Sequence, residues 1–278
     1  MNVREKGTQF PSPGRSSLPR GAVACDSPPV VAARVCFALF LVAFLGVCGA
    51  THDRAARQPA STTGAGACTD RLPLDTPRPL ILALHGARQG GYGMQRYTGL
   101  SDDANGFLVA YPTTPHDNGF WDVDDVPRLL ALVDAIARCV PVSTVTAVGF
   151  SNGGLMANAL ACRAADRVRA VVLVASGLEG LGRCSPSRPV SVLDIHGTSD
   201  QVVGYRGLRA FVGAWARRDG CSSTPTARRE PERVTHVRWH GCTGGSRVEH
   251  LRVAGDTHGW PSLADANGPM VAFLRSLV

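Results

Sequence analysis

The sequence predicts a single, mostly parallel, doubly wound α/β domain, and three observations support this fold class. Continuous apolar runs are typical of strands buried on both faces of a parallel sheet. The stretch 79–84 is such a run, and 169–175 and 189–195 are predominantly apolar stretches that also predict buried strands. Helical apolar patterns alternate with them, as at 129–136 and 207–218. A serine bracketed by glycines at 149–153 separates a β-branched strand from an apolar helix start. Strands and helices that alternate in this way predict one layered α/β domain.

The chain is predicted to divide into a signal or targeting segment at 1–50, a polar linker at 51–67 and one folded domain at 68–278. A length of 278 residues with 44% hydrophobic content is enough to bury one sizeable core. The formal net charge of +7 is not gathered into a basic run interleaved with aromatic residues. We therefore expect no nucleic-acid partner.

The targeting segment has the pattern of a secretory signal peptide. An apolar stretch at 35–47 follows Arg34 and ends in small residues, and it is short for a membrane span. Cleavage after Ala50 would release a secreted protein with no membrane span, which is the form we expect. The alternative is a cell-surface lipoprotein anchored at Cys48, although Val47 stands where such a site favours a small residue.

Six of the nine cysteines lie beyond the targeting segment, and an even number in an exported chain favours three disulfides. They are Cys68, Cys139, Cys162, Cys184, Cys221 and Cys242. The sequence alone allows about 15 pairings. Among these we favour Cys221–Cys242 and Cys162–Cys184, which leaves Cys68–Cys139 by elimination. No Cys-x₂-Cys motif or His-rich cluster is present, so we expect no metal and no cofactor.

Two predicted elements lie between the first strand and the serine motif. Residues 106–111 form an apolar run that stops at a proline, which indicates a strand. Asp122, Asp124 and Asp125 precede a Val-Pro pair and the helical pattern at 129–136. Because carboxylates and proline are typical of a first helical turn, we interpret these acids as capping groups and not as catalytic ones.

The elements after the serine motif complete the domain. Residues 207–218 carry one apolar helix face, and 269–274 predict a closing helix. Residues 234–239 and 247–253 alternate apolar and polar side chains, as expected for a strand pair at a sheet edge. Three histidines in or beside this pair are predicted to lie at the surface: His236, His240 and His250.

Ser151 is predicted to be a nucleophile. It lies in Gly149-x-Ser151-x-Gly153 between a strand and a helix, the context of a nucleophile elbow. Glycine leaves the space that strand and helix backbones need to approach each other. The helix start also directs backbone N–H groups toward the place where an oxyanion would form.

A serine hydroxyl needs an imidazole base, and the imidazole needs a carboxylate that orients it. In α/β-hydrolases the chain order is serine, acid, histidine, with the partners on loops after later strands. Asp200 follows the strand at 189–195, and His258 follows the last predicted strand. We therefore predict Asp200 and His258 as the partners of Ser151, because Asp194 lies inside a strand.

The remaining predicted site residues surround this triad. His85-Gly86-Ala87 follows the first strand, so the backbone N–H groups of Ala87 and Asn152 are candidates for the oxyanion hole. His85 is interpreted as a structural side chain beneath the hole. Three aromatic residues are candidates for the wall of the substrate pocket, with core packing as the alternative: Phe120, Trp121 and Trp260.

Four motifs occur in order along 79–278: Leu82-Ala-Leu-His-Gly86, Gly149-Phe-Ser-Asn-Gly-Gly154, His196-Gly-Thr-Ser-Asp200 and His258-Gly-Trp-Pro261. Together they resemble the secreted polyhydroxybutyrate depolymerase/feruloyl esterase family, whose members are α/β-hydrolases related to esterase D and acetylxylan esterases. The resemblance implies an α/β-hydrolase catalytic domain at 68–278. It also implies Ser151 as nucleophile, Asp200 as acid, His258 as base and disulfides at the matching cysteines.

The chain departs from this family at Ala87, where many relatives carry cysteine or glycine, and at two further places. Cys68 stands too close to Pro79 for the usual opening hairpin in full, so a truncated N-terminal hairpin is expected. The segment 118–125 is also shortened, which affects the expected pocket.

The predicted function is an exported serine carboxylic-ester hydrolase that acts through an acyl-enzyme on a small or polymeric ester. Two alternatives stay open from the sequence. One is a peptidase or thioesterase that uses the same triad. The other is a catalytically inactive, envelope-binding homologue with the same fold.

Overall fold

The structure is a computed structural model that describes residues 76–176, 184–231, 233–262 and 264–278. The predictions for the targeting segment with Cys48, for the linker, for Cys68 and for the truncated hairpin lie outside these residues. Within the described ranges, no helix is both long and apolar enough to cross a membrane.

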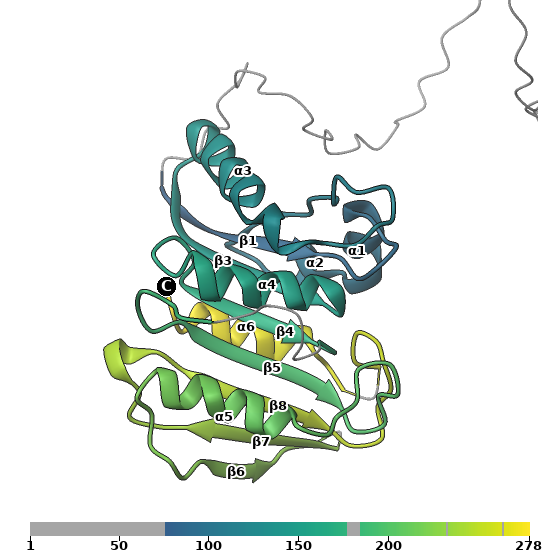
Figure 1. The fold of residues 1–278 in the computed structure, drawn as a ribbon, viewed down its shortest axis with the longest axis vertical. Helices are drawn as coiled ribbons and strands as arrows, with labels where there is room; N and C mark the ends of the chain where they lie inside the picture. Colours follow the sequence, from purple (N-terminus) through teal and green to yellow (C-terminus); the bar gives the residue numbers. More distant parts are fainter. Residues whose placement is uncertain (1–75, 177–183, 232, 263) are drawn as a thin grey trace, which may run out of the picture. The chain divides into compact units, whose positions relative to one another are not determined.

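A sheet of eight strands forms the centre of the domain, in the order β2-β1-β3-β4-β5-β8-β7-β6 (Figure 1). The strands are β1 (Arg78–Leu84), β2 (Leu108–Ala110), β3 (Val142–Phe150), β4 (Ala170–Val174), β5 (Ser191–Gly197), β6 (Thr226–Arg229), β7 (Val234–Trp239) and β8 (Val248–Val253). All neighbours from β2 to β8 pair in parallel, whereas β7 and β6 add an antiparallel extension. The predicted mostly parallel sheet is therefore confirmed.

Helices cover both faces of this sheet. They are α1 (Gly91–Thr98), α2 (Leu100–Asp103), α3 (Val126–Cys139), α4 (Asn152–Arg163), α5 (Leu208–Arg218) and α6 (Asn267–Arg275), with short 3₁₀ turns at η1 (Val123–Asp125) and η2 (Thr243–Gly245). Figure 1 looks onto α3, α4 and α5, while α6 lies behind the sheet. One apolar core, with Leu82 and Trp215, packs on the side of α3, α4 and α5. The other, with Ile81 and Phe273, packs on the side of α6, as expected for a doubly wound fold.

The acids before α3 cap a helical turn, as predicted. The side chain of Asp122 accepts a hydrogen bond from the Asp124 N–H at 3.0 Å. The Asp125 side chain accepts from the Asp122 N–H at 2.9 Å, which completes a capping box. Asp125 is also buried and lies 3.1 Å from the His116 ring nitrogen. The turn is therefore tied to the loop before it.

The edge of the sheet differs from the prediction. The β8 segment is not at the edge, because β5 pairs with it on one side and β7 on the other. The edge strand is β6, whose residues are exposed and carry no apolar alternation that could have predicted it. As a result His250, on β8, is buried and not at the surface as expected, while His240 is exposed.

The turn between β3 and α4 holds Ser151 at φ 53° and ψ −118°. Such a backbone conformation costs a non-glycine residue about 1–3 kcal/mol and needs support from its surroundings. Here the Ser151 N–H donates to the Val174 carbonyl at 2.9 Å, and the Gly154 N–H donates to the Ser151 carbonyl at 2.9 Å. The turn is thus fixed both to the neighbouring strand β4 and to the first turn of α4.

Gly149 and Gly153 allow this turn to be close-packed. A Cβ atom on Gly149 would lie 2.1 Å from the carbonyl oxygen of Gly153. A Cβ atom on Gly153 would lie 2.2 Å from the carbonyl oxygen of Leu84, at the end of β1. The backbones of β1, β3 and α4 therefore meet at one point, for the reason that the glycine spacing predicted.

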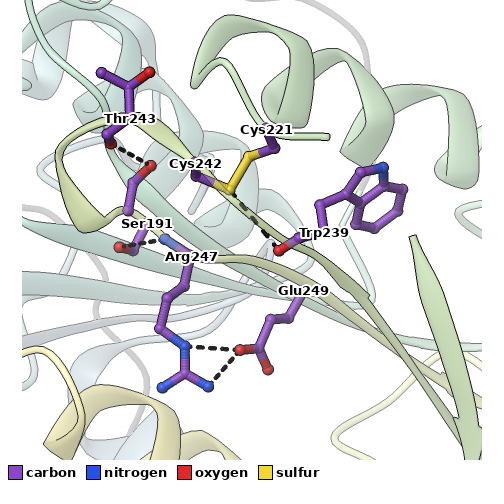
Figure 2. The surroundings of a disulfide bond; sticks show 8 residues. Ser191, Cys221, Trp239, Cys242, Thr243, Arg247 and Glu249 are labelled. Carbon is purple, nitrogen blue, oxygen red and sulfur yellow. Dashed lines mark hydrogen bonds and ion pairs between the residues drawn. A yellow bond between two sulfur atoms is a disulfide. The ribbon is translucent and has the colours of Figure 1, made fainter. Parts of the chain in front are cut away.

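Two of the favoured disulfides are present. Cys162–Cys184 joins the end of α4 to the segment before β5, and Cys221–Cys242 joins the segments after α5 and β7 (Figure 2). Cys139 is disulfide-bonded as well, whereas Cys68, its expected partner, lies outside the described residues. The Cys68–Cys139 pairing stays a prediction.

A buried carboxylate on β8 anchors the antiparallel extension. Glu249 accepts a hydrogen bond from Arg247 Nε at 2.8 Å, and its other oxygen lies 2.6 Å from His236 Nε2 on β7 (Figure 2 shows the arginine side). Burial alone would raise the pKa of Glu249, but the hydrogen bond from His236 and the charge of Arg247 outweigh it and hold this pKa below its ordinary value. The ionised carboxylate therefore stabilises the contact between β7 and β8.

We expect Gly149→Ala to disrupt the β3–α4 turn, because the new methyl group would overlap the Gly153 carbonyl. The cost should exceed the 1–3 kcal/mol of ordinary overpacking, since backbone atoms must move. Thermal unfolding and the yield of folded protein measure this. Gly93→Ala is the control, because a Cβ there meets nothing within 4 Å inside α1. An unchanged midpoint in Gly149→Ala would contradict the close packing.

We expect Glu249→Gln to lower stability by about 2 kcal/mol at neutral pH, because it removes the charge paired with Arg247 and weakens the hydrogen bond with His236. The folded pKa of Glu249 is depressed, so its contribution is complete above the ordinary glutamate pKa of about 4.3 and is lost as pH falls through the folded value. The difference between wild type and variant in chemical denaturation should therefore shrink below about pH 4.

Glu230→Gln serves as the matched control for this experiment. Glu230 lies 3.4 Å from the largely exposed Arg228, and such surface pairs contribute little. A variant at Glu230 that loses as much stability as the one at Glu249 would contradict the assignment of the contribution to the buried carboxylate.

Candidate active site

Ser151, His258 and Asp200 meet at the carboxyl end of the parallel strands. Ser151 lies at the β3–α4 turn, Asp200 in the loop after β5 and His258 in the loop after β8. His258 Nε2 lies 3.0 Å from Ser151 Oγ, and His258 Nδ1 lies 2.8 Å from Asp200 Oδ2. The structure therefore brings all three predicted residues into one continuous chain of hydrogen bonds.

The direction of these hydrogen bonds follows from the donors available. A carboxylate only accepts, so the proton of a neutral His258 lies on Nδ1 and points to Asp200. Nε2 is then the acceptor, and the Ser151 hydroxyl donates to it. This tautomer leaves the imidazole ready to take the serine proton.

Asp200 is held in a shell of donors. Its Oδ1 accepts from the backbone N–H groups of Val202 at 2.9 Å and Val203 at 2.8 Å. Burial would raise the pKa of Asp200, but the hydrogen bonds from His258, Val203 and Val202 outweigh it and hold the pKa below its ordinary value. Asp200 is therefore ionised at neutral pH and can stabilise an imidazolium at His258.

The backbone around the predicted oxyanion hole is supported from below. His85 is fully buried, and its Nε2 accepts a hydrogen bond from the Thr114 N–H at 3.1 Å. Burial lowers the pKa of His85, which keeps it neutral, as the accepted hydrogen bond requires. The Trp121 indole N–H donates to the His85 carbonyl at 3.0 Å. His85 thus fastens the segment that leads to Ala87, in agreement with a structural role.

The first residue of α4 is oriented by the same segment. The Asn152 side-chain oxygen accepts from the Trp121 N–H at 2.7 Å. Its backbone N–H is one of the first in the helix, which have no acceptor within the helix. No hydrogen bond of the described residues uses the N–H of Ala87 or of Asn152. Both groups are therefore available as donors, and their role as the oxyanion hole stays a prediction.

The three aromatic pocket candidates occupy different environments. Trp121 is 7% exposed and packs against His85 with ring centroids 4.9 Å apart, so most of its ring is in the core. Phe120 is 38% exposed and lines a cavity of about 520 Å³ together with Arg88, Thr113 and His116. Two of its lining residues are neighbours of site candidates in the chain. Arg88 follows Ala87, and Phe120 precedes Trp121, whose N–H contacts the Asn152 side chain.

Trp260 lies on the histidine side of the site. Its backbone N–H donates to the Tyr97 hydroxyl at 2.8 Å, and its indole N–H donates to Asn267 at 3.0 Å. Phe150 packs between Tyr97 and His258, at centroid distances of 5.5 Å and 5.4 Å. Aromatic rings therefore support the imidazole face. The pocket roles of Phe120, Trp121 and Trp260 stay predictions.

Sequence reasoning did not identify the polar residues behind Asp200. His196 Nε2 lies 3.1 Å from Asp200 Oδ2, with both side chains fully buried. The signal was present in the His-Gly-Thr-Ser-Asp motif, where the histidine precedes the acid by four positions. Asp194, His250 and Tyr205 form a second group nearby through hydrogen bonds of 2.6 and 2.9 Å. In the described part of the chain, no cluster of three or more potential ligands could hold a metal ion.

The chain is similar to fungal esterases along most of its folded part. It is 34% identical over 187 residues to feruloyl esterase D of Neurospora crassa, covering 66% of this chain and 56% of that protein. A probable feruloyl esterase C of Aspergillus oryzae is 27% identical over 208 residues, covering 67% and 76%. A bifunctional acetylxylan esterase/xylanase of Neocallimastix patriciarum is 29% identical over 199 residues, but this chain spans only 29% of its length.

Fold comparisons agree with these relatives. Residues 110–190 match the family described as alpha/beta hydrolase fold. The acetyl xylan esterase of Aspergillus awamori superposes with a TM-score of 0.59 at 15% identity, over 72% of this chain and 89% of that one. Esterase PE8 superposes with a TM-score of 0.51 at 19% identity, over 73% and 94%.

The predicted fold and the feruloyl esterase part of the predicted resemblance are confirmed by these matches. The polyhydroxybutyrate depolymerase part is not tested by them and stays a prediction. The fungal relatives, the matched family and the mostly parallel sheet agree with one another. This chain has an α/β-hydrolase fold, and its sequence is similar to those of feruloyl esterases.

Proposed function

We propose that this protein is an exported serine hydrolase that cleaves carboxylic esters through an acyl-enzyme. The observation that carries the proposal is the chain of contacts from Ser151 Oγ through His258 to Asp200, at 3.0 Å and 2.8 Å. The esterase names of the fungal relatives support the same class of bond. No chemistry beyond these side chains and water is required.

In the acylation step, Ser151 Oγ attacks the ester carbonyl carbon while His258 Nε2 takes the hydroxyl proton. The tetrahedral intermediate carries its negative charge on the former carbonyl oxygen. The N–H groups of Ala87 and Asn152 would stabilise that oxygen, and an oxyanion-hole donor of this kind contributes about 3 kcal/mol in the transition state. His258 then gives its proton to the leaving alcohol, and the acyl group stays on Ser151.

Deacylation repeats these steps with water as the nucleophile. His258 takes a proton from water, the hydroxyl oxygen attacks the acyl carbon, and the Ser151 oxygen leaves and recovers its proton. The Asp200 carboxylate stabilises the imidazolium in both halves, because it stays ionised in its shell of donors.

The substrate class follows from the relatives and from the space beside the site. The similarity to feruloyl and acetylxylan esterases supports feruloyl or acetyl esters as substrates. The cavity lined by Phe120 and Arg88, the residue that follows Ala87 in the chain, is a candidate for holding part of such an ester. The disulfides Cys162–Cys184 and Cys221–Cys242 support an exported protein.

Replacement of Ser151 by Ala should reduce kcat on p-nitrophenyl acetate and methyl ferulate by at least about 1,000-fold, because the nucleophile is lost. The wild type should react stoichiometrically with a fluorophosphonate probe, and Ser151→Ala should not. A pre-steady-state burst of p-nitrophenol in the wild type would report the acyl-enzyme.

Ser223→Ala is the matched control, because Ser223 is exposed in the segment after α5 and should leave turnover unchanged. Circular dichroism and thermal unfolding show whether Ser151→Ala stays folded. Retained turnover in folded Ser151→Ala would reject the assignment. A wild type that does not react with the probe would indicate the inactive homologue instead.

A further inference from the structure

Two buried histidines that the proposed mechanism does not use contact the loop that carries Asp200. This loop comprises residues 198–207 and is called the acid loop here. We propose that His196 and the hydrogen-bonded group Tyr205–His250–Asp194 position Asp200 against His258 and thereby control the turnover rate. The inference rests on the proposed function, because it concerns the acid of that triad.

The acid loop has few apolar contacts of its own. Val202 is 73% exposed, and Gln201, Gly204 and Arg206 are exposed as well. Asp200 in the same loop is only 5% exposed. Loops with little buried apolar surface open locally at low free-energy cost. The position of the Asp200 carboxylate therefore depends on the polar contacts that hold the loop to the sheet.

The first contact is a chain of three side chains. The Tyr205 hydroxyl lies 2.9 Å from His250 Nε2, and His250 Nδ1 lies 2.6 Å from Asp194 Oδ2. Because the carboxylate can only accept, Nδ1 donates to Asp194, which leaves Nε2 of a neutral His250 as the acceptor for Tyr205. Burial raises the pKa of Tyr205, so its hydroxyl keeps the proton that it donates. The Tyr205 end of the acid loop is thus bound to β8 through His250 and to β5 through Asp194.

The second contact acts directly at the acid. His196 Nε2 lies 2.9 Å from the Val203 carbonyl oxygen and 3.1 Å from Asp200 Oδ2. The Val203 N–H in turn donates to Asp200 Oδ1 at 2.8 Å. The Val203 peptide groups are therefore fixed between His196 and the carboxylate. His196 Nδ1 has no hydrogen-bond partner in the described part of the chain, which agrees with a neutral ring whose proton is on Nε2.

These groups come from one face of the sheet. Asp194 and His196 alternate along β5 and so point to the same side. His250 is opposite Asp194 in the register of β5 and β8. All three side chains are buried, and Asp194 Oδ1 has no hydrogen-bond partner among the described residues. Apolar residues would fill these positions at lower desolvation cost, so stability alone does not account for this arrangement.

A positioning role has a specific kinetic signature. Displacement of a catalytic group by about 1 Å can cost about 100-fold in rate, whereas substrate binding by other residues is unaffected. A variant that loosens the acid loop should therefore lower kcat and leave KM nearly unchanged. A purely structural defect would instead reduce the fraction of active molecules.

The decisive variant is Tyr205→Phe, which removes one hydroxyl and keeps the ring. We expect kcat on p-nitrophenyl acetate, per serine titrated with fluorophosphonate, to fall about tenfold with KM within about twofold of wild type. Tyr92→Phe is the matched control. Tyr92 is 60% exposed on α1, and within the described ranges its hydroxyl accepts from Arg96 on the same helix, so the same deletion there should change neither constant.

His196 is tested by a conservative rescue. His196→Leu removes the Nε2 donor, and we expect about a 100-fold loss of kcat per titrated serine. His196→Gln can present an amide N–H near the position of Nε2 and should recover at least about a tenth of wild-type kcat. If His196→Leu does not fold, Tyr205→Phe still decides the question.

The outcomes separate this inference from the proposed function. An active wild type whose kcat per titrated serine is unchanged in Tyr205→Phe would overturn the inference alone. A loss that is explained entirely by fewer titratable serines would do the same, since it marks a structural role. A folded wild type that neither turns over esters nor reacts with the probe would overturn the proposed function and this inference together.

Discussion

Backbones pack closely at the β3–α4 turn, and the candidate site depends on this packing. With no side chain at Gly149 or Gly153, the helix start can approach within contact of the ends of β3 and β1. That approach holds Ser151 at a positive φ and places the first N–H groups of α4 beside its hydroxyl. The turn therefore fixes the positions of Ser151 and of the first N–H groups of α4 relative to each other.

The strand order brings the other two residues to this point. The β6–β7 hairpin lies between β5 and β8 in sequence, yet it is added outside β8, so β5 and β8 stay neighbours. Their carboxyl ends therefore meet at one edge, and the loops with Asp200 and His258 come within hydrogen-bond distance. If the β6–β7 hairpin were inserted between β5 and β8 in the sheet, it would separate Asp200 from His258. Because the hairpin is added at the edge of the sheet, the two residues stay together.

Sequence patterns predicted the three residues that lie together, Ser151, Asp200 and His258, because each follows a strand whose apolar pattern is strong and local. They did not predict β6, since Thr226–Arg229 is exposed and has no apolar alternation. They also did not predict the burial of His250, because its partner Asp194 is distant in the chain and the pair forms only across the β5–β8 register. Local periodicity predicts which apolar residues are buried. The burial of a polar residue depends on hydrogen-bond partners that are distant in the sequence.

The strands β5 and β8 and the loops that follow them carry two Asp–His pairs, and their different positions explain why only one can act on a serine. Asp194 and His250 face each other within the sheet, where His250 Nε2 is occupied by Tyr205. Asp200 and His258 lie beyond the strand ends, where His258 keeps an 18% exposed side chain and its Nε2 faces Ser151. The Asp194–His250 pair is covered by Tyr205, whereas His258 of the other pair is partly exposed to solvent. Since the inner pair holds the loop that carries the outer acid, the two pairs form one connected arrangement and not a repeated site.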